Sequence, residues 1–232
     1  MKIAIINFSG NVGKTTIARH LLLPRMPKAD LISIESANAD EGETDALKGR
    51  QFAQLQEAMQ LHADLIVDIG ASNIEDLIAG MEKFKGSHKD FDFFVVPTVA
   101  DAKQLRDTAN TIAKLASIGV EPARIRIVLN RVDGGISVEE QFDILVKYLA
   151  ANPLCAFDAK CAITENELYQ LVKHDSRSIG ELADDTTDFK RLIAKAATRQ
   201  EKIDIADKLA IKRLASGVLP ELDACFKALA LA

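Results

Sequence analysis

The sequence predicts an α/β protein with a doubly wound, mostly parallel sheet that is covered by helices on both faces. Apolar segments that suit strands alternate with segments of helical periodicity along most of the 232 residues. The strand segments are apolar throughout, as expected for strands buried on both faces. In addition, the first strand runs directly into a glycine-containing loop and a helix. Ligands of such sheets bind at the carboxyl ends of the strands, so the residues that follow each strand are the candidates for a site.

The elements follow from the periodicity of the apolar residues. Five clear strands and a weaker sixth are expected at residues 2–8, 31–35, 65–69, 91–97, 125–130 and 154–158. Helices are expected between and after them at residues 15–23, 45–62, 73–84, 102–118, 138–151 and 165–174. Pro24 ends the first helix because proline cannot continue a helix.

Composition bounds the class of protein. The chain is 48% hydrophobic and 27% charged with a formal net charge of -5, which suits one sizeable core and argues against a surface that binds nucleic acid all over. We expect a core at residues 1–186 and a C-terminal helical extension at residues 187–232, packed on the same domain. The three cysteines, Cys155, Cys161 and Cys225, form no metal-binding spacing. No run reaches the roughly 18 apolar residues of a membrane span, so the expected location is the cytoplasm.

The loop after the first strand predicts a phosphate-binding site. It reads Ser9-Gly10-Asn11-Val12-Gly13-Lys14-Thr15-Thr16. Backbone N–H groups of such a loop surround an anion, and the following helix adds the positive end of its dipole. Lys14 would reach the β/γ-phosphates and Thr15 would bind Mg²⁺. Phe8 stands where the full pattern has glycine, and the alternative is a plain glycine turn with an incidental lysine.

The third strand ends in an acid and a glycine. This pattern is typical of a Walker B element, in which Asp68 would hold Mg²⁺ directly or through water. The N–H of Gly70 could meet the γ-phosphate. The alternative is an ordinary surface turn, where Asp and Gly are common.

The segment after the second strand should lie beside the phosphates. Glu35 could assist the metal, and Asp40 or Glu41 could orient an attacking water, because phosphoryl transfer needs a positioned nucleophile more than a strong base. A polar, exposed connection is an equally good explanation of Asp40.

The fifth strand ends in Asn130 and Arg131. The amide of Asn130 can pair with a purine edge, and the sequence Asn-Arg-x-Asp, which ends at Asp133, is similar to the Asn-Lys-x-Asp that reads guanine in GTPases. These residues alone leave the base undecided. The alternative is that Asn130 only caps the turn into Gly134.

Taken together, these residues resemble the ParA/MinD group of deviant Walker A ATPases, whose loop reads K-G-G-x-G-K-[ST]. The resemblance covers about the first 180 residues. The matching positions are Gly10, Gly13, Lys14, Thr15, Asp68, Pro97 and Asn130.

More narrowly, three segments look like the StbB/TraL-type plasmid stability proteins of conjugative plasmids. They read IINFSGNVGKTTIARHLL, VDIGASN and FVVPT. The resemblance implies an ATP- and Mg²⁺-dependent homodimer in plasmid stability, segregation or conjugative transfer. Its partners would be plasmid-encoded DNA-binding or transfer proteins, and Asn130 would contact adenine.

Three departures from the ParA/MinD pattern concern the loop and the second strand. The first lysine of the loop, which in that group reaches the partner subunit's phosphates, is Ser9 here, and the usual Asp-x-Asp is Glu35-Ser36-Ala37. Both changes affect hydrolysis and not binding, so we expect a weak Mg-dependent ATPase. Asn11 replaces a loop glycine, which is tolerated because Asn accepts positive φ better than other non-glycine residues.

The C-terminal region changes character. A long helix is expected at residues 188–216, with Arg191, Lys195 and Arg199 on one face, where they could contact DNA phosphates weakly or simply be solvated. Residues 219–232 carry an apolar face that includes Leu222 and Leu229, which suits core packing or a subunit contact better than a membrane.

Three functions are compatible with this pattern. The first is an ATP-dependent switch in plasmid segregation or transfer. The second is a small-molecule enzyme of the same fold, such as an ATP-dependent carboxylase or amidoligase relative. The third is a nucleotide-bound scaffold that does not hydrolyse, which the serine at position 9 favours.

Overall fold

The computed structural model of the chain describes residues 1–34 and 45–231. They form two compact units, one made of Met1–Glu165 with Cys225–Ala232 and the other of Asn166–Ala224. The sequence suggested a division after residue 186, and that division stays a prediction about domain organisation.

The first unit is built on a six-stranded sheet in the order β2-β3-β1-β4-β5-β6, and all neighbouring strands are parallel. The strands are β1 Lys2–Ile5, β2 Asp30–Ile34, β3 Leu65–Ile69, β4 Phe93–Thr98, β5 Ile125–Val132 and β6 Ala162–Thr164. β1 lies between β3 and β4, so its carboxyl end, which leads into the loop, is at the middle of the sheet edge. The predicted α/β class with a parallel sheet is confirmed.

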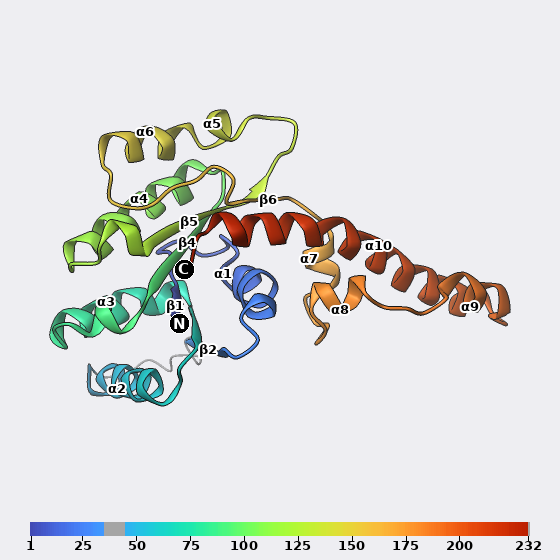
Figure 1. Ribbon diagram of the computed structural model, residues 1–232, viewed down its shortest axis with the longest axis horizontal. Coiled ribbons are helices and arrows are strands. Elements are labelled where there is room, and N and C mark those ends of the chain that lie inside the picture. Colours follow the sequence, from blue (N-terminus) through green and yellow to red (C-terminus); the bar gives the residue numbers. More distant parts are fainter. Residues whose placement is uncertain (35–44, 232) are drawn as a thin grey trace. The chain divides into compact units, whose positions relative to one another are not determined.

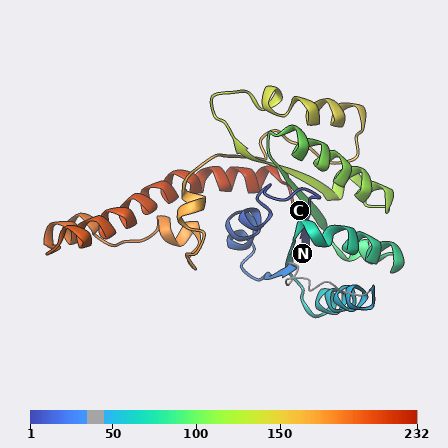
Figure 2. The same ribbon diagram turned by 180° about the vertical axis from the view of Figure 1, so that it is seen from behind.

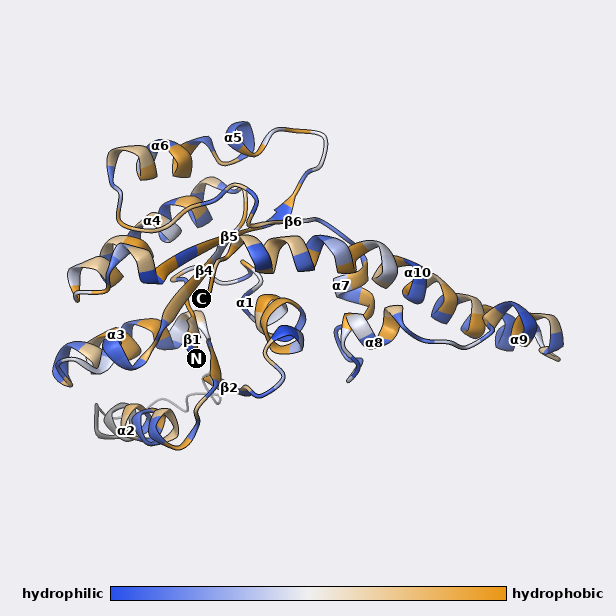
Figure 3. Cartoon of the chain, viewed as in Figure 1, coloured by the Kyte–Doolittle hydropathy of each residue, from blue (hydrophilic) through white to orange (hydrophobic). Residues whose placement is uncertain are grey.

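Helices cover both faces of this sheet (Figures 1 and 2). One face carries α2 Asp45–Leu61, α3 Ile74–Lys83, α4 Ala102–Ser117, α5 Val138–Gln141 and α6 Asp143–Ala151. Their apolar side chains share one core with the strands: Met59, Ile78 and Ile112 are almost fully buried with Val67 and Val96. Figure 3 shows the strands of the sheet mainly in the colours of hydrophobic residues.

The opposite face carries the helix that follows the loop. It starts as α1 Lys14–Thr16, continues with π-helical hydrogen bonding as η1 Ile17–Leu22, and ends as a 3-10 turn, η2 Leu23–Arg25. Ile17 and Leu21 of η1 are fully buried. The single helix expected at residues 15–23 is therefore present in position, and Pro24 lies in its last turn.

The sixth strand is displaced from its expected place. Residues 154–158 form only an isolated bridge, between Ala156 and Arg126, and β6 pairs with β5 instead. Leu154 and Phe157 are partly buried against the core without joining the ladder. Apolar composition alone cannot separate a strand from an extended segment that packs on a core, and this is why the prediction at 154–158 was wrong.

The second unit contains short helices and most of a long one. They are α7 Leu168–Leu171, α8 Ile179–Ala183, α9 Phe189–Lys195 and α10 Arg199–Ala228, of which the last turn belongs to the first unit. The helix expected at residues 188–216 is interrupted between α9 and α10, because Thr198 caps α10. Its Oγ1 accepts from Glu201 N and its N–H donates to a Glu201 carboxylate oxygen, both at 3.1 Å. Arg191, Lys195 and Arg199 are exposed but do not share one helix face.

The C-terminal end belongs to the core of the first unit. Cys225 and Leu229 are fully buried. Arg126 at the start of β5 holds this end, since its Nε donates to Leu229 O at 2.8 Å and its Nη2 to Ala230 O at 3.2 Å. Cations at a helix C-terminus also complement the helix dipole. None of the helices in the described residues has the length and apolar character needed to cross a membrane.

Candidate functional site

The loop between β1 and α1 adopts the conformation that the sequence requires of it. Gly13 has φ 91° and Asn11 has φ 58°, both in the left-handed region. Glycine at position 13 is needed for a second reason: a Cβ there would lie 2.1 Å from Asn130 Nδ2. The tolerance of Asn11 for positive φ, expected from its side chain, is confirmed. Gly10 is exposed, and a Cβ there would meet open space.

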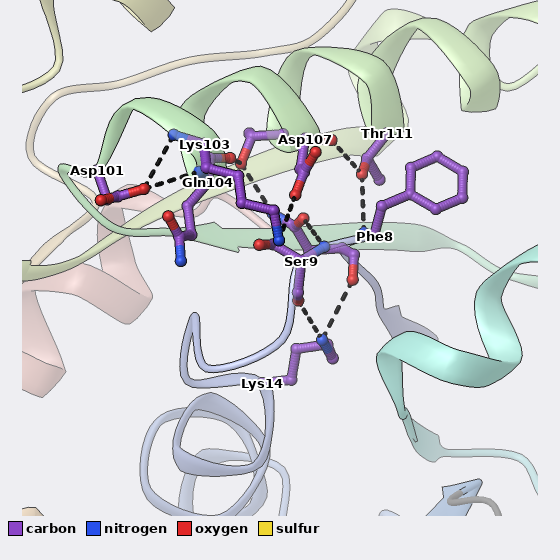
Figure 4. Close-up of polar contacts among 10 residues, drawn as sticks. Phe8, Ser9, Lys14, Asp101, Lys103, Gln104, Asp107 and Thr111 are labelled. Carbon is purple, nitrogen blue, oxygen red and sulfur yellow. Dashed lines mark hydrogen bonds and ion pairs between the residues drawn. The ribbon is translucent and has the colours of Figure 1, made fainter.

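Lys14 begins α1, and its ammonium group bends back onto the loop. Nζ donates to Ser9 O at 2.7 Å, as Figure 4 shows, and to Asn7 O at 3.2 Å. The side chain is buried, and burial lowers the pKa of Lys14, while the nearby Asp68 carboxylate partly opposes this shift. The buried ammonium of Lys14 donates to these two neutral carbonyls, so an anion beside it would stabilise its charge. The residues therefore fit a phosphate group.

Thr15 and Asp68 meet across the sheet edge. Thr15 Oγ1 donates to Asp68 Oδ2 at 2.6 Å. Asp68 lies in β3 beside Ile5 of β1, and only 4% of it is exposed. A hydroxyl and a carboxylate oxygen are ligands that Mg²⁺ accepts, with water completing its shell. The structure thus brings together the two residues that the sequence assigned to a metal.

A buried polar network that the sequence did not reveal supports the loop from below. Asn7 Nδ2 donates to Pro97 O and to Thr108 Oγ1, each at 2.8 Å, and Asn7 Oδ1 accepts from Ser9 N at 2.8 Å. Thr111 Oγ1 of α4 accepts from Phe8 N at 3.1 Å. A signal for this network was present, because Asn7 is a polar residue in an otherwise apolar segment. The strand expected at residues 2–8 included it, whereas β1 ends before it.

Ser9 is turned into the protein. Its exposed fraction is 2%, and its Oγ has no hydrogen-bond partner among the residues that the structure describes. A buried hydroxyl without a partner costs free energy, so this position calls for a physical explanation. The side chain at position 9 points into the protein. A cation that reaches another subunit would instead have to extend outward.

Gly70 uses its backbone N–H within the sheet edge. The N–H donates to Ile34 O at 2.8 Å, and Asn73 Nδ2 donates to the same oxygen at 3.0 Å. A contact from Gly70 to a γ-phosphate would require this hydrogen bond to open. Glu35, Asp40 and the neighbouring Glu41, which the sequence suggested for metal assistance and water orientation, lie outside the described residues.

Asn130 and Arg131 end β5 next to the loop. Asn130 is 4% exposed, and its Nδ2 donates to Val12 O at 3.0 Å. The side chain therefore braces the loop directly, a role that the sequence did not suggest. Arg131 is exposed and has φ 53°, where β5 and β6 change register. Non-glycine residues in this conformation are strained, and strain of this kind is common at functional sites.

The acid of the expected guanine-reading sequence has a local role. Asp133 Oδ1 accepts from Gly135 N at 2.8 Å and so closes the turn after β5. Thr16 and Val12 complete the loop, with Val12 fully buried beneath it.

The six-stranded parallel sheet with the loop between β1 and α1 has a fold of the ParA/MinD type. Similar solved structures include apo McdA of Cyanothece, with a TM-score of 0.56 and 14% identity over 90% of this chain and 98% of that one. MinD of Aquifex aeolicus has a TM-score of 0.52 and 15% identity over 90% and 96% of the two chains.

A third similar structure is MinD of Pyrococcus horikoshii in complex with Mg-ADP. Its TM-score is 0.52 at 13% identity, over 94% of this chain and 95% of that one. At such identities the likeness establishes the fold alone. No protein-family model and no curated protein matches the sequence.

Proposed function

We propose that the protein is an Mg-ATP-binding switch with slow ATPase activity. The observation that carries the proposal is the position of Lys14 and of the Thr15–Asp68 pair around one left-handed loop. Lys14 would exchange the carbonyls of Ser9 and Asn7 for phosphate oxygens, and Thr15 with Asp68 would hold Mg²⁺. The complexes of Pyrococcus horikoshii MinD with Mg-ADP and of a Cyanothece McdA variant with ATP support this class of ligand.

The biological role in this proposal is plasmid stability, segregation or conjugative transfer in the cytoplasm. It is supported by the resemblance of the three sequence segments to plasmid stability proteins. The switch would work by nucleotide-dependent dimerisation and by binding a second protein, and the MinC:MinD complex of Aquifex aeolicus, with a TM-score of 0.50, offers a parallel. Direct DNA contact through the exposed Arg191, Lys195 and Arg199 would be weak, because these side chains are on two separate helices.

The second candidate is a nucleotide-bound scaffold that does not hydrolyse ATP. The burial of Ser9 favours it, since no outward-reaching cation extends from this position of the loop. A cation that stabilises charge on the transferring phosphoryl group is worth about 10³–10⁵ in rate in systems where an arginine supplies it. We therefore expect basal hydrolysis well below about 1 s⁻¹.

Melting measurements test the nucleotide site. Mg-ATP at about a hundredfold its Kd stabilises by about 2.7 kcal/mol, which raises melting by about 5–10 °C in a chain of this size. Lys14→Ala should remove most of this rise, whereas Lys160→Ala, at an exposed position of the first unit, should keep it. An unchanged rise in Lys14→Ala would refute the phosphate site.

Light scattering tests the switch. The mass of the wild-type protein should double with Mg-ATP and not with Mg-ADP, and Lys14→Ala should stay monomeric. If the mass does not depend on nucleotide, the switch is contradicted and the non-hydrolysing scaffold remains as the candidate function. ATPase activity with and without plasmid DNA and cell extract would then separate the two candidates, since only the switch is stimulated.

Competition between ATP and GTP tests which nucleotide base the site recognises. ATP should compete far better than GTP, and Asn130→Ala should weaken ATP binding by about 1–3 kcal/mol through loss of hydrogen bonds. Because Asn130 also braces the loop, the ratio of ATP to GTP affinity is the informative quantity. Equal or better binding of GTP would instead support guanine recognition that involves Asp133.

A further inference from the structure

A cavity that is open to solvent lies at the opposite end of the sheet from the loop. It has a volume of about 750 Å³ and opens at the amino ends of β4 and β5. Its charged lining includes Lys89, Arg124, Arg126 and a single acid, Asp92, and Phe93 forms part of its wall. None of these residues belongs to the nucleotide site.

Both guanidinium groups of this cavity are fixed in place by neutral acceptors. Arg124 donates from Nε to Asp92 O and from Nη2 to Lys89 O, both at 3.1 Å. Arg126 donates to the carbonyls of Ala123, Leu229 and Ala230, and its Cζ lies 5.1 Å from the centroid of the Phe93 ring. Each guanidinium has five N–H donors, so donors remain after these bonds. The side chains are thus ordered before any ligand arrives.

The positive charge of the cavity is not balanced by its own acid. No ion pair of Lys89, Arg124 or Arg126 occurs among the side chains of residues 1–34 and 51–231. The carboxylate of Asp92 has other partners: its Oδ2 accepts from Lys2 N at 2.7 Å and lies 4.0 Å from the ammonium of Met1, which also lines the cavity. Partial burial lowers the pKa of Arg126, so its charged form lacks stabilisation that an anion would supply.

Scattered surface cations are normally solvated and need no ligand. These cations differ because they converge on one concavity and because two of them are held by backbone carbonyls. The concavity is open to solvent, and its volume of about 750 Å³ leaves room for a small anion. A planar guanidinium presents paired N–H donors that match the oxygens of a phosphate group.

We propose that this cavity binds a small phosphate-bearing anion with at least two negative charges, at Lys89, Arg124 and Arg126. Since Arg126 also holds the carbonyls of Leu229 and Ala230, an anion here would contact the residue that fixes the C-terminal end of the chain.

Pyrophosphate is a suitable probe, and Lys14→Ala is the background, so that the loop does not compete for it. Titration at about 0.15 M ionic strength is followed by the ¹⁵N–¹H Nε resonances of Arg124 and Arg126. These resonances should shift saturably. Lys89→Gln with Arg124→Gln should weaken binding by at least about tenfold, because two charge-assisted contacts are lost. Lys160→Gln, outside the cavity, should leave it unchanged.

Three results would overturn the proposal. They are the absence of a saturable shift, equal weakening by Lys160→Gln, and binding of a hexaglutamate peptide without binding of pyrophosphate. Arg126→Gln is not used, because loss of its contacts to the C-terminal carbonyls endangers folding. If the double variant unfolds, Lys89→Gln alone serves, since the Lys89 side chain takes part in none of the guanidinium contacts. The test is independent of the proposed ATPase because Lys14 is absent throughout.

Discussion

Thr15 Oγ1 and Asp68 Oδ2 are joined by a hydrogen bond of 2.6 Å that links the first turn of α1 to β3. The two residues are 53 positions apart, and the pairing of β1 with β3 brings them together. The hydroxyl donates to a carboxylate whose surroundings are almost closed to solvent. A divalent cation bound here would replace the Thr15 hydroxyl as the partner of the negatively charged Asp68 carboxylate.

Asp68→Asn tests this pair. The amide oxygen can still accept from Thr15, so the fold should persist, but the charge that attracts Mg²⁺ is lost. We expect the melting rise with Mg-ATP, about 5–10 °C in the wild type, to fall to the value seen without Mg²⁺. Asp143→Asn, at an exposed position of α6, is the control. A full Mg²⁺-dependent rise in Asp68→Asn would show that another group binds the metal.

Ser9→Ala should stabilise the protein without nucleotide. The substitution removes a buried hydroxyl that has no partner in the described part of the chain. The expected gain is about 1 kcal/mol, or about 2–4 °C in melting temperature. Ser117→Ala is the matched control, because the exposed Ser117 hydroxyl already donates to Lys114 O. A lower melting temperature for Ser9→Ala would mean that the hydroxyl is satisfied, for example by water.

Gly13 and Asn130 should be coupled energetically. Gly13→Ala places a Cβ against Asn130 Nδ2 and strains a residue with φ 91°, so we expect a loss of about 2–4 kcal/mol in urea unfolding. Asn130→Ala leaves Val12 O without its donor and should cost about 1–3 kcal/mol.

The double variant Gly13→Ala/Asn130→Ala separates the two costs. It should lose less than the sum of the single variants by about 1 kcal/mol or more, because the clash disappears while the strain remains. Gly134→Ala, where a Cβ would meet nothing within 4 Å, should be close to neutral. Strict additivity would contradict the observed contact.

His88 should make stability depend on pH. Burial lowers the pKa of His88 below 6.5, and the charges of Lys89 and Arg124 add to this effect, while Asp90 opposes it. Between the folded pKa and 6.5 the unfolded chain therefore binds more protons than the folded one. Stability contributed by this residue is present above pH 6.5 and is lost as the pH falls through that interval.

The measurement is urea unfolding at about pH 7.5 and about pH 5, on either side of the ordinary histidine pKa. His88→Gln cannot take up a proton, so its loss of stability on acidification should be smaller than that of the wild type. His62→Gln is the comparison variant, because it replaces a histidine that contacts Asp30 and lies outside the surroundings of His88. An equal acid loss in wild type and His88→Gln would show that His88 does not titrate in this range.

Five of the six strands were predictable because each of them is a continuous apolar segment. The expected segment 65–69 is β3 to the residue, since a buried run of Leu, Ile and Val has no helical alternative of that length. The loop was predictable because left-handed turns demand Gly13 and accept Asn11. The contact between Asp68 and Thr15 then follows from the pairing of β1 with β3, because the two residues are far apart in the sequence.

Other features depend on partners that are distant in sequence. Residues 154–158 look like a strand but lack the neighbour that β6 has in β5. Asn7 joins Thr108, 101 positions away, and no local pattern announces such a bond. Proline usually ends a helix, yet α10 continues through Pro220. Burial of Leu222, Cys225 and Leu229 after the proline stabilises the continued helix.

The bonds from Arg126 to Leu229 and Ala230 have a consequence for synthesis of the chain. The carbonyls that this guanidinium holds are 103 and 104 positions later in the sequence. Translation proceeds from the N-terminus, so the sheet can form on a nascent chain while residues 166–224 are still being added. The core of the first unit nevertheless stays open until Cys225 and Leu229 have left the ribosome, because their buried side chains complete it.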